Sequence, residues 1–406
     1  MIKIKKPALY VLLIIVTAAL ITLTILIKLN PTNALNNSSS SNNNSTNINV
    51  EAQDDFLKIK DCFVQSDPKV CLDNFISGYA VNNPETKIIL NAMEVARTQD
   101  SGIENDCHNI AHAIGRYTYK KYSNIGDAFN ACDQSCHSGC YHGVMERMFY
   151  SDEEISTKTH LTFKDIEAKM PGVCDSSKFS NPSPTEIFQC LHGVGHAVLF
   201  SLDYNLEDSL KACDLLANDY ERSSCWGGVI MENVTAFDKK KRDLKAGDYL
   251  YPCNKLDDKY QYSCYMMQTS VMFEYGLTAD QIGEQCKLAK YPNACFISLG
   301  RDLSNFVRTG DIDYVRRTCE NLTDGDYRRN CLDGSIYALI DNTWDAQFAF
   351  KFCNSMQTPS NKYTCYKDSI NYLRGVYQKN NEQITQECEL HAGSELNVCK
   401  ENILLL

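Results

Sequence analysis

Apolar side chains recur at helical spacing on both sides of each close pair of cysteines. Val315 and Cys319 show this spacing before the turn-forming residues 323–326, and Leu332 and Ile336 show it again after them. Sustained alternation of polar and apolar residues, the sign of a half-buried strand, is absent from the sequence. The pattern therefore predicts an all-α protein built from helical hairpins.

The cysteines occur in order as close pairs along the chain. From Cys253 onward the first cysteine of each pair recurs every 33 to 35 residues, at Cys286, Cys319, Cys353 and Cys388. This is the length of one helix–turn–helix unit of a solenoid. A disulfide within each pair would join the two helices of a hairpin and stabilise it by roughly 2 to 3 kcal/mol. The predicted pairs are Cys62 with Cys71, Cys174 with Cys190, Cys213 with Cys225, Cys253 with Cys264, Cys286 with Cys295, Cys319 with Cys331, Cys353 with Cys365, and Cys388 with Cys399.

Four further cysteines allow three connectivities. Among them we favour Cys132 with Cys140 across a hairpin and Cys107 with Cys136. The reason is that Cys107 opens a predicted helix, and the helix before it contains no cysteine.

The repeat period and the linked hairpins resemble Sel1-like and tetratricopeptide-type helical repeats, especially the cysteine-rich Sel1-like proteins secreted by some bacteria. The likeness spans roughly residues 55–406, although the tetratricopeptide Trp-Leu-Gly-Tyr signature is not evident in any unit. The resemblance implies a right-handed α/α superhelix with a concave groove that binds a protein partner. The predicted fold class is an α/α solenoid of disulfide-stapled helical hairpins, preceded by one transmembrane helix.

The N-terminus has the pattern of a membrane anchor. Lys3, Lys5 and Lys6 precede an uncharged run from Pro7 to Ile27, and a helix of that length spans roughly 30 Å of hydrocarbon. A cleaved signal peptide is the alternative, but the apolar run continues beyond its poor cleavage site. We expect a cytoplasmic segment at 1–6, a transmembrane signal-anchor at 7–28, a disordered Asn/Ser-rich linker at 29–54, and helical repeats at 55–240 and 241–406.

The net charge and the cysteine content restrict the possible partners and the cellular compartment of the protein. A formal net charge of -11 argues against a nucleic-acid partner, which would require a basic face. Twenty cysteines are typical of an oxidising compartment. Together with the anchor, they predict a single-pass protein of the cell membrane whose C-terminal domain is extracytoplasmic.

Six of the eight histidines fall within 89 consecutive residues and recur near cysteines. Side chains four residues apart share one helix face, and neighbouring repeats bring equivalent helices within about 8 to 10 Å. Such histidines can converge on one metal ion or on a pair. The predicted ligands are His108, His112, His142, Glu146, His192 and His196, with Glu232 as a further contributor. Nitrogen and oxygen donors suit a transition metal ion such as Zn, Fe, Cu or Mn.

A purely structural interpretation is the alternative, because duplication copies a motif whatever its purpose. We expect His137 to lie in a turn, and the isolated His160 and His391 to be surface residues. A zinc protease is disfavoured because Asn109 and Gly193 stand where its glutamate would follow the first histidine. Haem and nucleotide cofactors are not expected, since the spacing from Cys132 to Cys136 and His137 is one residue too long for haem and no phosphate-binding loop occurs.

Two functions remain open at this point. The first is a metal site between about residues 103 and 232, for capture or for catalysis, with Glu146 or Glu232 as general base on a metal-bound water. The second is a metal-free scaffold for protein–protein interaction at the cell surface. The repeats after Glu232 carry no histidine behind their second cysteines, which favours a structural role for that part.

Overall fold

The computed structural model describes residues 55–151 and 160–404, and its regular secondary structure is helical throughout. No strand occurs in these two stretches. The predicted all-α class is therefore confirmed.

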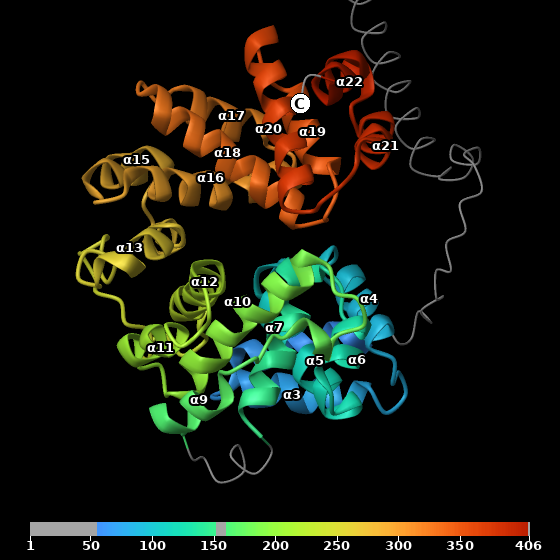
Figure 1. The fold of residues 1–406 in the computed structure, drawn as a ribbon, viewed down its shortest axis with the longest axis vertical. Coiled ribbons are helices and arrows are strands. Elements are labelled where there is room, and N and C mark those ends of the chain that lie inside the picture. The colour runs from blue at the N-terminus through green and yellow to red at the C-terminus, as the bar shows by residue number, and fades with distance from the viewer. Residues whose placement is uncertain (1–54, 152–159, 405–406) are drawn as a thin grey trace, which may run out of the picture. The chain divides into compact units, whose positions relative to one another are not determined.

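Helices α3 to α12 and two short 3₁₀ helices form the N-terminal part (Figure 1). Their bounds are η1 Leu57–Val64, α3 Pro68–Tyr79, α4 Thr86–Arg97, α5 Ser101–Tyr122, α6 Ile125–Ala131, α7 Ser135–Phe149, α9 Phe163–Lys169, η2 Ser176–Lys178, α10 Pro184–Ser201, α11 Leu206–Cys213 and α12 Asp219–Thr235. Helices α13 to α22 follow after a stretch of turns. Their bounds are α13 Asp258–Tyr265, α14 Thr269–Glu274, α15 Ala279–Leu288, α16 Pro292–Thr309, α17 Ile312–Glu320, α18 Gly325–Asp341, α19 Gln347–Asn354, α20 Pro359–Gly375, α21 Asn381–His391, η3 Gly393–Glu395 and α22 Leu396–Leu404.

Local caps fix where the helices that carry the histidines begin. The carboxylate of Asp100 accepts hydrogen bonds from the backbone N–H groups of Gly102 and Ile103 at the start of α5. Ser183 and Glu186 form a reciprocal capping box at the start of α10. Both arrangements satisfy N–H groups that a helix N-terminus would otherwise leave unpaired. Capping residues a little more than two turns earlier thus set where His108 and His192 lie on their helices.

All twenty cysteines are bridged, and the ten disulfides coincide with the pairs expected from the sequence. The agreement includes the connectivity favoured for the four cysteines that allowed three arrangements. The disulfides join Cys62 to Cys71, Cys107 to Cys136, Cys132 to Cys140, Cys174 to Cys190, Cys213 to Cys225, Cys253 to Cys264, Cys286 to Cys295, Cys319 to Cys331, Cys353 to Cys365, and Cys388 to Cys399.

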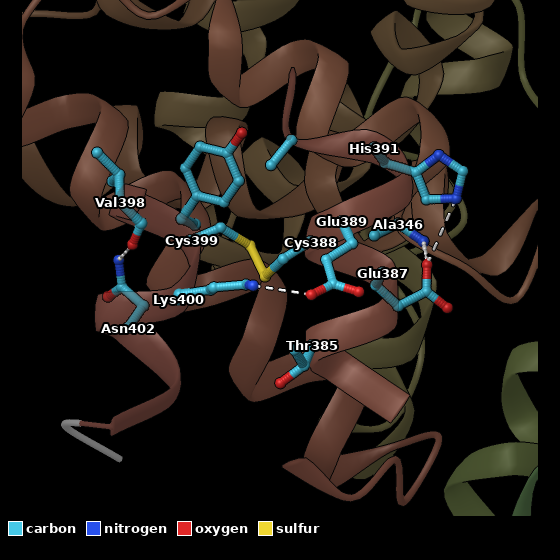
Figure 2. Close-up of a disulfide and its surroundings, with 12 residues drawn as sticks. Ala346, Thr385, Glu387, Cys388, Glu389, His391, Val398, Cys399, Lys400 and Asn402 are labelled. Carbon is cyan, nitrogen blue, oxygen red and sulfur yellow. Dashed lines mark hydrogen bonds and ion pairs between the residues drawn. A yellow bond between two sulfur atoms is a disulfide. The ribbon is translucent and has the colours of Figure 1, made fainter. Parts of the chain in front are cut away.

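Most of the disulfides are local. Nine of them have sequence separations of only 8 to 16 residues, whereas Cys107–Cys136 has a separation of 29. Figure 2 shows Cys388–Cys399, which joins α21 to α22. Most of the bridges therefore fix one hairpin each.

Helices α5, α7, α10 and α12 pack one against the next in chain order (Figure 1). Glycines three residues after Cys140 and Cys225 make this packing close. A Cβ atom at Gly143 would overlap the carbonyl oxygen of His112, and one at Gly228 would overlap that of His192. Only glycine permits such an approach between helix backbones. The segments that carry the histidines are in consequence held against each other.

The predicted fold class is wrong in its finer part. The units are unequal: α5 has 22 residues and α14 has 6, and residues 236–257 contain no α-helix. A regular solenoid is not confirmed. The division into repeats at 55–240 and 241–406 stays a prediction, since all the described residues belong to one unit by their contacts.

The membrane prediction also needs correction. Within the part of the chain that the structure describes, no helix combines the length and the apolar character needed to cross a bilayer. Helix α5 is long enough but carries charged side chains such as Glu104, Asp106 and Arg116. The predicted transmembrane part of the fold class and the single-pass membrane localisation are corrected on this finding. The predicted cytoplasmic segment, span and linker, residues 1–54, lie outside the described residues.

Candidate metal centre

Four histidines from three helices converge at one point. One ring nitrogen from each of them lies within 4.8 Å of those of the other three. Three of the rings are buried, and one, on α5, is partly exposed. The rings of His142 and His196 are stacked with centroids 4.6 Å apart. The four residues are His108 and His112 on α5, His142 on α7 and His196 on α10.

The two rings on α5 present lone pairs to each other. Nδ1 of His108 lies 2.9 Å from the carbonyl oxygen of Cys136, and Nδ1 of His112 lies 2.7 Å from Oε1 of Glu146. A carbonyl and an ionised carboxylate only accept hydrogen bonds, so each Nδ1 carries a proton and donates it. Both Nε2 atoms then hold lone pairs, yet they are only 3.0 Å apart. A cation between them would turn this repulsion into attraction.

The other two rings are arranged in the same way. Nε2 of His142 lies 3.0 Å from Oε1 of Gln189, and Nδ1 of His196 lies 2.9 Å from Oε2 of Glu232. The remaining nitrogens, Nδ1 of His142 and Nε2 of His196, are buried and have no hydrogen-bond partner. Leaving such a group unpaired costs about 1 to 3 kcal/mol. In all four rings, therefore, an oxygen fixes one nitrogen and leaves the other free, as in metal-bound histidines.

Burial keeps these rings uncharged. Loss of solvation is the main cause that lowers the pKa of His108 to about 3 and the pKa of His196 to about 3. The same cause lowers the pKa of His112, and it lowers that of His142 well below its usual value. At neutral pH, protons are thus not available to separate the facing lone pairs. Neutral imidazole is also the form that binds metal ions.

The predicted ligand Glu146 lies behind His112. Its Oε2 atom is 2.5 Å from Nη1 of Arg116 and 3.0 Å from Nζ of Lys69. Burial alone would raise the pKa of Glu146, but Lys69, Arg116 and His112 lower it well below its usual value. Glu146 is therefore ionised and orients the His112 ring by accepting its proton.

Glu232 has the corresponding position behind His196. Its second carboxylate oxygen accepts a 2.9 Å hydrogen bond from the Tyr204 hydroxyl. Oxygens of Glu146 and Glu232 and a nitrogen of His112 also lie within 4.8 Å of one another. Arg116 and Lys69 already contact Glu146, so the charge of that carboxylate is partly neutralised by protein cations. Their predicted role as general bases stays a prediction.

The remaining histidines are not members of the four-histidine group. Nε2 of His192, a predicted ligand, is 3.4 Å from Sδ of Met231. His137 is exposed and has a left-handed backbone conformation with φ of 56°. His160 is exposed. His391 forms a third candidate group with Glu387 and Asp345, and Figure 2 shows its ring beside Glu387. Lys379 already pairs with Glu387.

Several residues that shape the site gave no signal in the sequence. Lys69 reaches Glu146 across 77 residues of chain, and the carbonyl of Cys136 is a backbone group. Gln189 immediately precedes Cys190, and its position about one turn before His192 could have suggested a contact with the site. Tyr204 lies beyond the end of α10. Such contacts depend on how the helices pack.

The chain was compared with family models, curated proteins and solved structures. None of the three comparisons finds a match. The resemblance to Sel1-like and tetratricopeptide-type repeats accordingly stays a prediction.

Proposed function

We propose that this protein binds one transition metal ion through four imidazole nitrogens. The observation that carries the proposal is the 3.0 Å contact between two nitrogens, each of which holds a lone pair because its partner nitrogen donates to an oxygen. Two more ring nitrogens, buried and unpaired, complete the donor set. The proposed ligand atoms are Nε2 of His108, Nε2 of His112, Nδ1 of His142 and Nε2 of His196.

The donor set narrows the choice of metal. Imidazole suits Zn, Cu, Fe and Ni, whereas Mn prefers carboxylate, carbonyl and water oxygens. Because the two nearby glutamates lie behind the histidines, the set consists of nitrogen alone. Of the four metals expected from the sequence, we therefore favour Zn, Cu or Fe over Mn.

The number of ligands favours metal binding over hydrolysis. A tetrahedral ion with four protein ligands has no open position, whereas hydrolytic zinc sites keep one for water. In this proposal Glu146 and Glu232 act as positioning residues that hold the rings and supply negative charge near the cation. The ten disulfides fit a protein that holds its metal in an oxidising compartment.

Elemental analysis of the purified full-length chain tests the proposal. After metal removal and reloading with Zn²⁺, we expect one ion per chain, and its loss in His112→Ala and His196→Ala. His160→Ala is the matched control, because His160 is exposed and lies outside the group. Metal-free variants that fold as the wild type does, measured by circular dichroism, would show that the loss is local. A wild-type chain that binds no ion would leave the metal-free scaffold as the explanation.

A further inference from the structure

His192 makes an unusual contact with a thioether. Its Nε2 atom lies 3.4 Å from Sδ of Met231 on α12. Both side chains are partly exposed, so that small solutes can reach them. A thioether has no hydrogen to donate and accepts hydrogen bonds only weakly. The contact is therefore a poor hydrogen bond in either protonation state of the ring.

The His192 ring lies beside groups of both α10 and α12. The Phe188 ring lies one helical turn earlier, with centroids 5.5 Å apart and planes tilted by 30°. A Cβ atom at Gly227 would lie 3.4 Å from Nδ1 of His192. When Nδ1 carries the ring proton, Nε2 holds a lone pair that points at the sulfur of Met231.

The spacing of the two atoms fits two ligands of a single ion. With bonds of about 2.0 Å to nitrogen and about 2.3 Å to sulfur, a tetrahedral angle places the two donors roughly 3.5 Å apart. The observed distance is 3.4 Å. The thioether is a soft donor, which suits monovalent copper, and imidazole also binds copper.

We propose that His192 and Met231 form a second, outer binding position for monovalent copper. The His192 ring lies 5.1 Å from the rings of both His142 and His196, measured between centroids. The outer position thus borders the four-histidine group, and its own two side chains are partly exposed. This proposal depends on a different contact from the proposed function, but it extends that function to copper and to a second ion.

Anaerobic titration of the full-length chain with Cu⁺ in competition with a chromogenic chelator tests the outer position. We expect two ions per chain in the wild type and one in Met231→Leu, which removes sulfur at nearly constant volume. Met148→Leu is the matched control, because Met148 is half-buried on α7 and the thioether–histidine hydrogen-bond contact of the described residues involves Met231 instead. Binding of Zn²⁺ should be the same in all three proteins.

X-ray absorption of the copper-loaded chain supplies a second readout. We expect a sulfur scatterer in the wild type and in Met148→Leu, and none in Met231→Leu. Equal copper content in wild type and Met231→Leu with nitrogen scatterers alone would overturn the proposal. A single Cu⁺ that is lost in Met231→Leu but kept in His112→Ala would support the outer position and contradict the four-histidine site.

Discussion

His112 and Glu146 are joined by a 2.7 Å hydrogen bond between α5 and α7. The carboxylate that receives this bond also contacts Lys69 and Arg116. A buried negative charge thus fixes which nitrogen of His112 is protonated and which is free. Through this contact, residues from three helices determine the orientation of one metal-binding ring.

Glu146→Gln should weaken metal binding without abolishing it. The amide still offers an oxygen to Nδ1 of His112, but it removes the charge that balances the nearby cations. Changes of this kind cost about 10- to 100-fold in metal affinity. Competition with a chelator of known affinity measures the change. Glu284→Gln, at an exposed position on α15, is the control and should bind as the wild type does; an unchanged affinity in Glu146→Gln would contradict this role.

Gly143→Ala should disrupt both the helix packing and the site. The new Cβ atom would overlap the carbonyl oxygen of His112, so α5 and α7 would have to separate. Overpacking of this kind costs about 1 to 3 kcal/mol in the free energy of unfolding. Denaturant unfolding and metal content measure the two effects. In Gly78→Ala, where nothing lies within 4 Å of the added methyl group, we expect no loss of either; a stable, metal-loaded Gly143→Ala would show that the close packing is dispensable.

The sequence predicts the local parts of this protein better than the distant ones. Cysteine pairs and helical spacing are local, and both the helical class and the ten bridges agree with them. The pair His108 and His112, one turn apart, does meet at the site. The equivalent pair on α10 does not, because His192 faces Met231 on α12 while His196 faces the group. Which of two histidines one turn apart faces the site depends on helix packing that spacing alone does not specify.

Loss of the Cys107–Cys136 disulfide should lower metal affinity as well as stability. This bridge holds the residue whose carbonyl oxygen accepts the His108 hydrogen bond. Replacing both cysteines by serine should reduce the free energy of unfolding by about 3 to 4 kcal/mol. The metal content should fall, as measured by elemental analysis. Replacing Cys388 and Cys399 is the comparison, because that bridge joins α21 to α22 and should affect stability alone. Equal metal content in the two double variants would argue against a positioning role for Cys136.

Asp341 should make the protein less stable as the pH rises. Burial raises the pKa of Asp341 to about 6, although hydrogen bonds from the hydroxyls of Tyr377 and Tyr372 partly offset this. In the unfolded chain an aspartate has a pKa of about 3.9. Between about pH 4 and pH 6 the unfolded state therefore releases a proton that the folded state retains. The free energy of unfolding falls across this pH range and levels off above it.

Denaturant unfolding at several pH values tests this prediction. We expect a shallower fall for Asp341→Asn than for the wild type, whereas Asp280→Asn, at an exposed position on α15, should follow the wild type. Parallel curves for the wild type and Asp341→Asn would mean that this carboxyl is already ionised in the folded protein at pH 4.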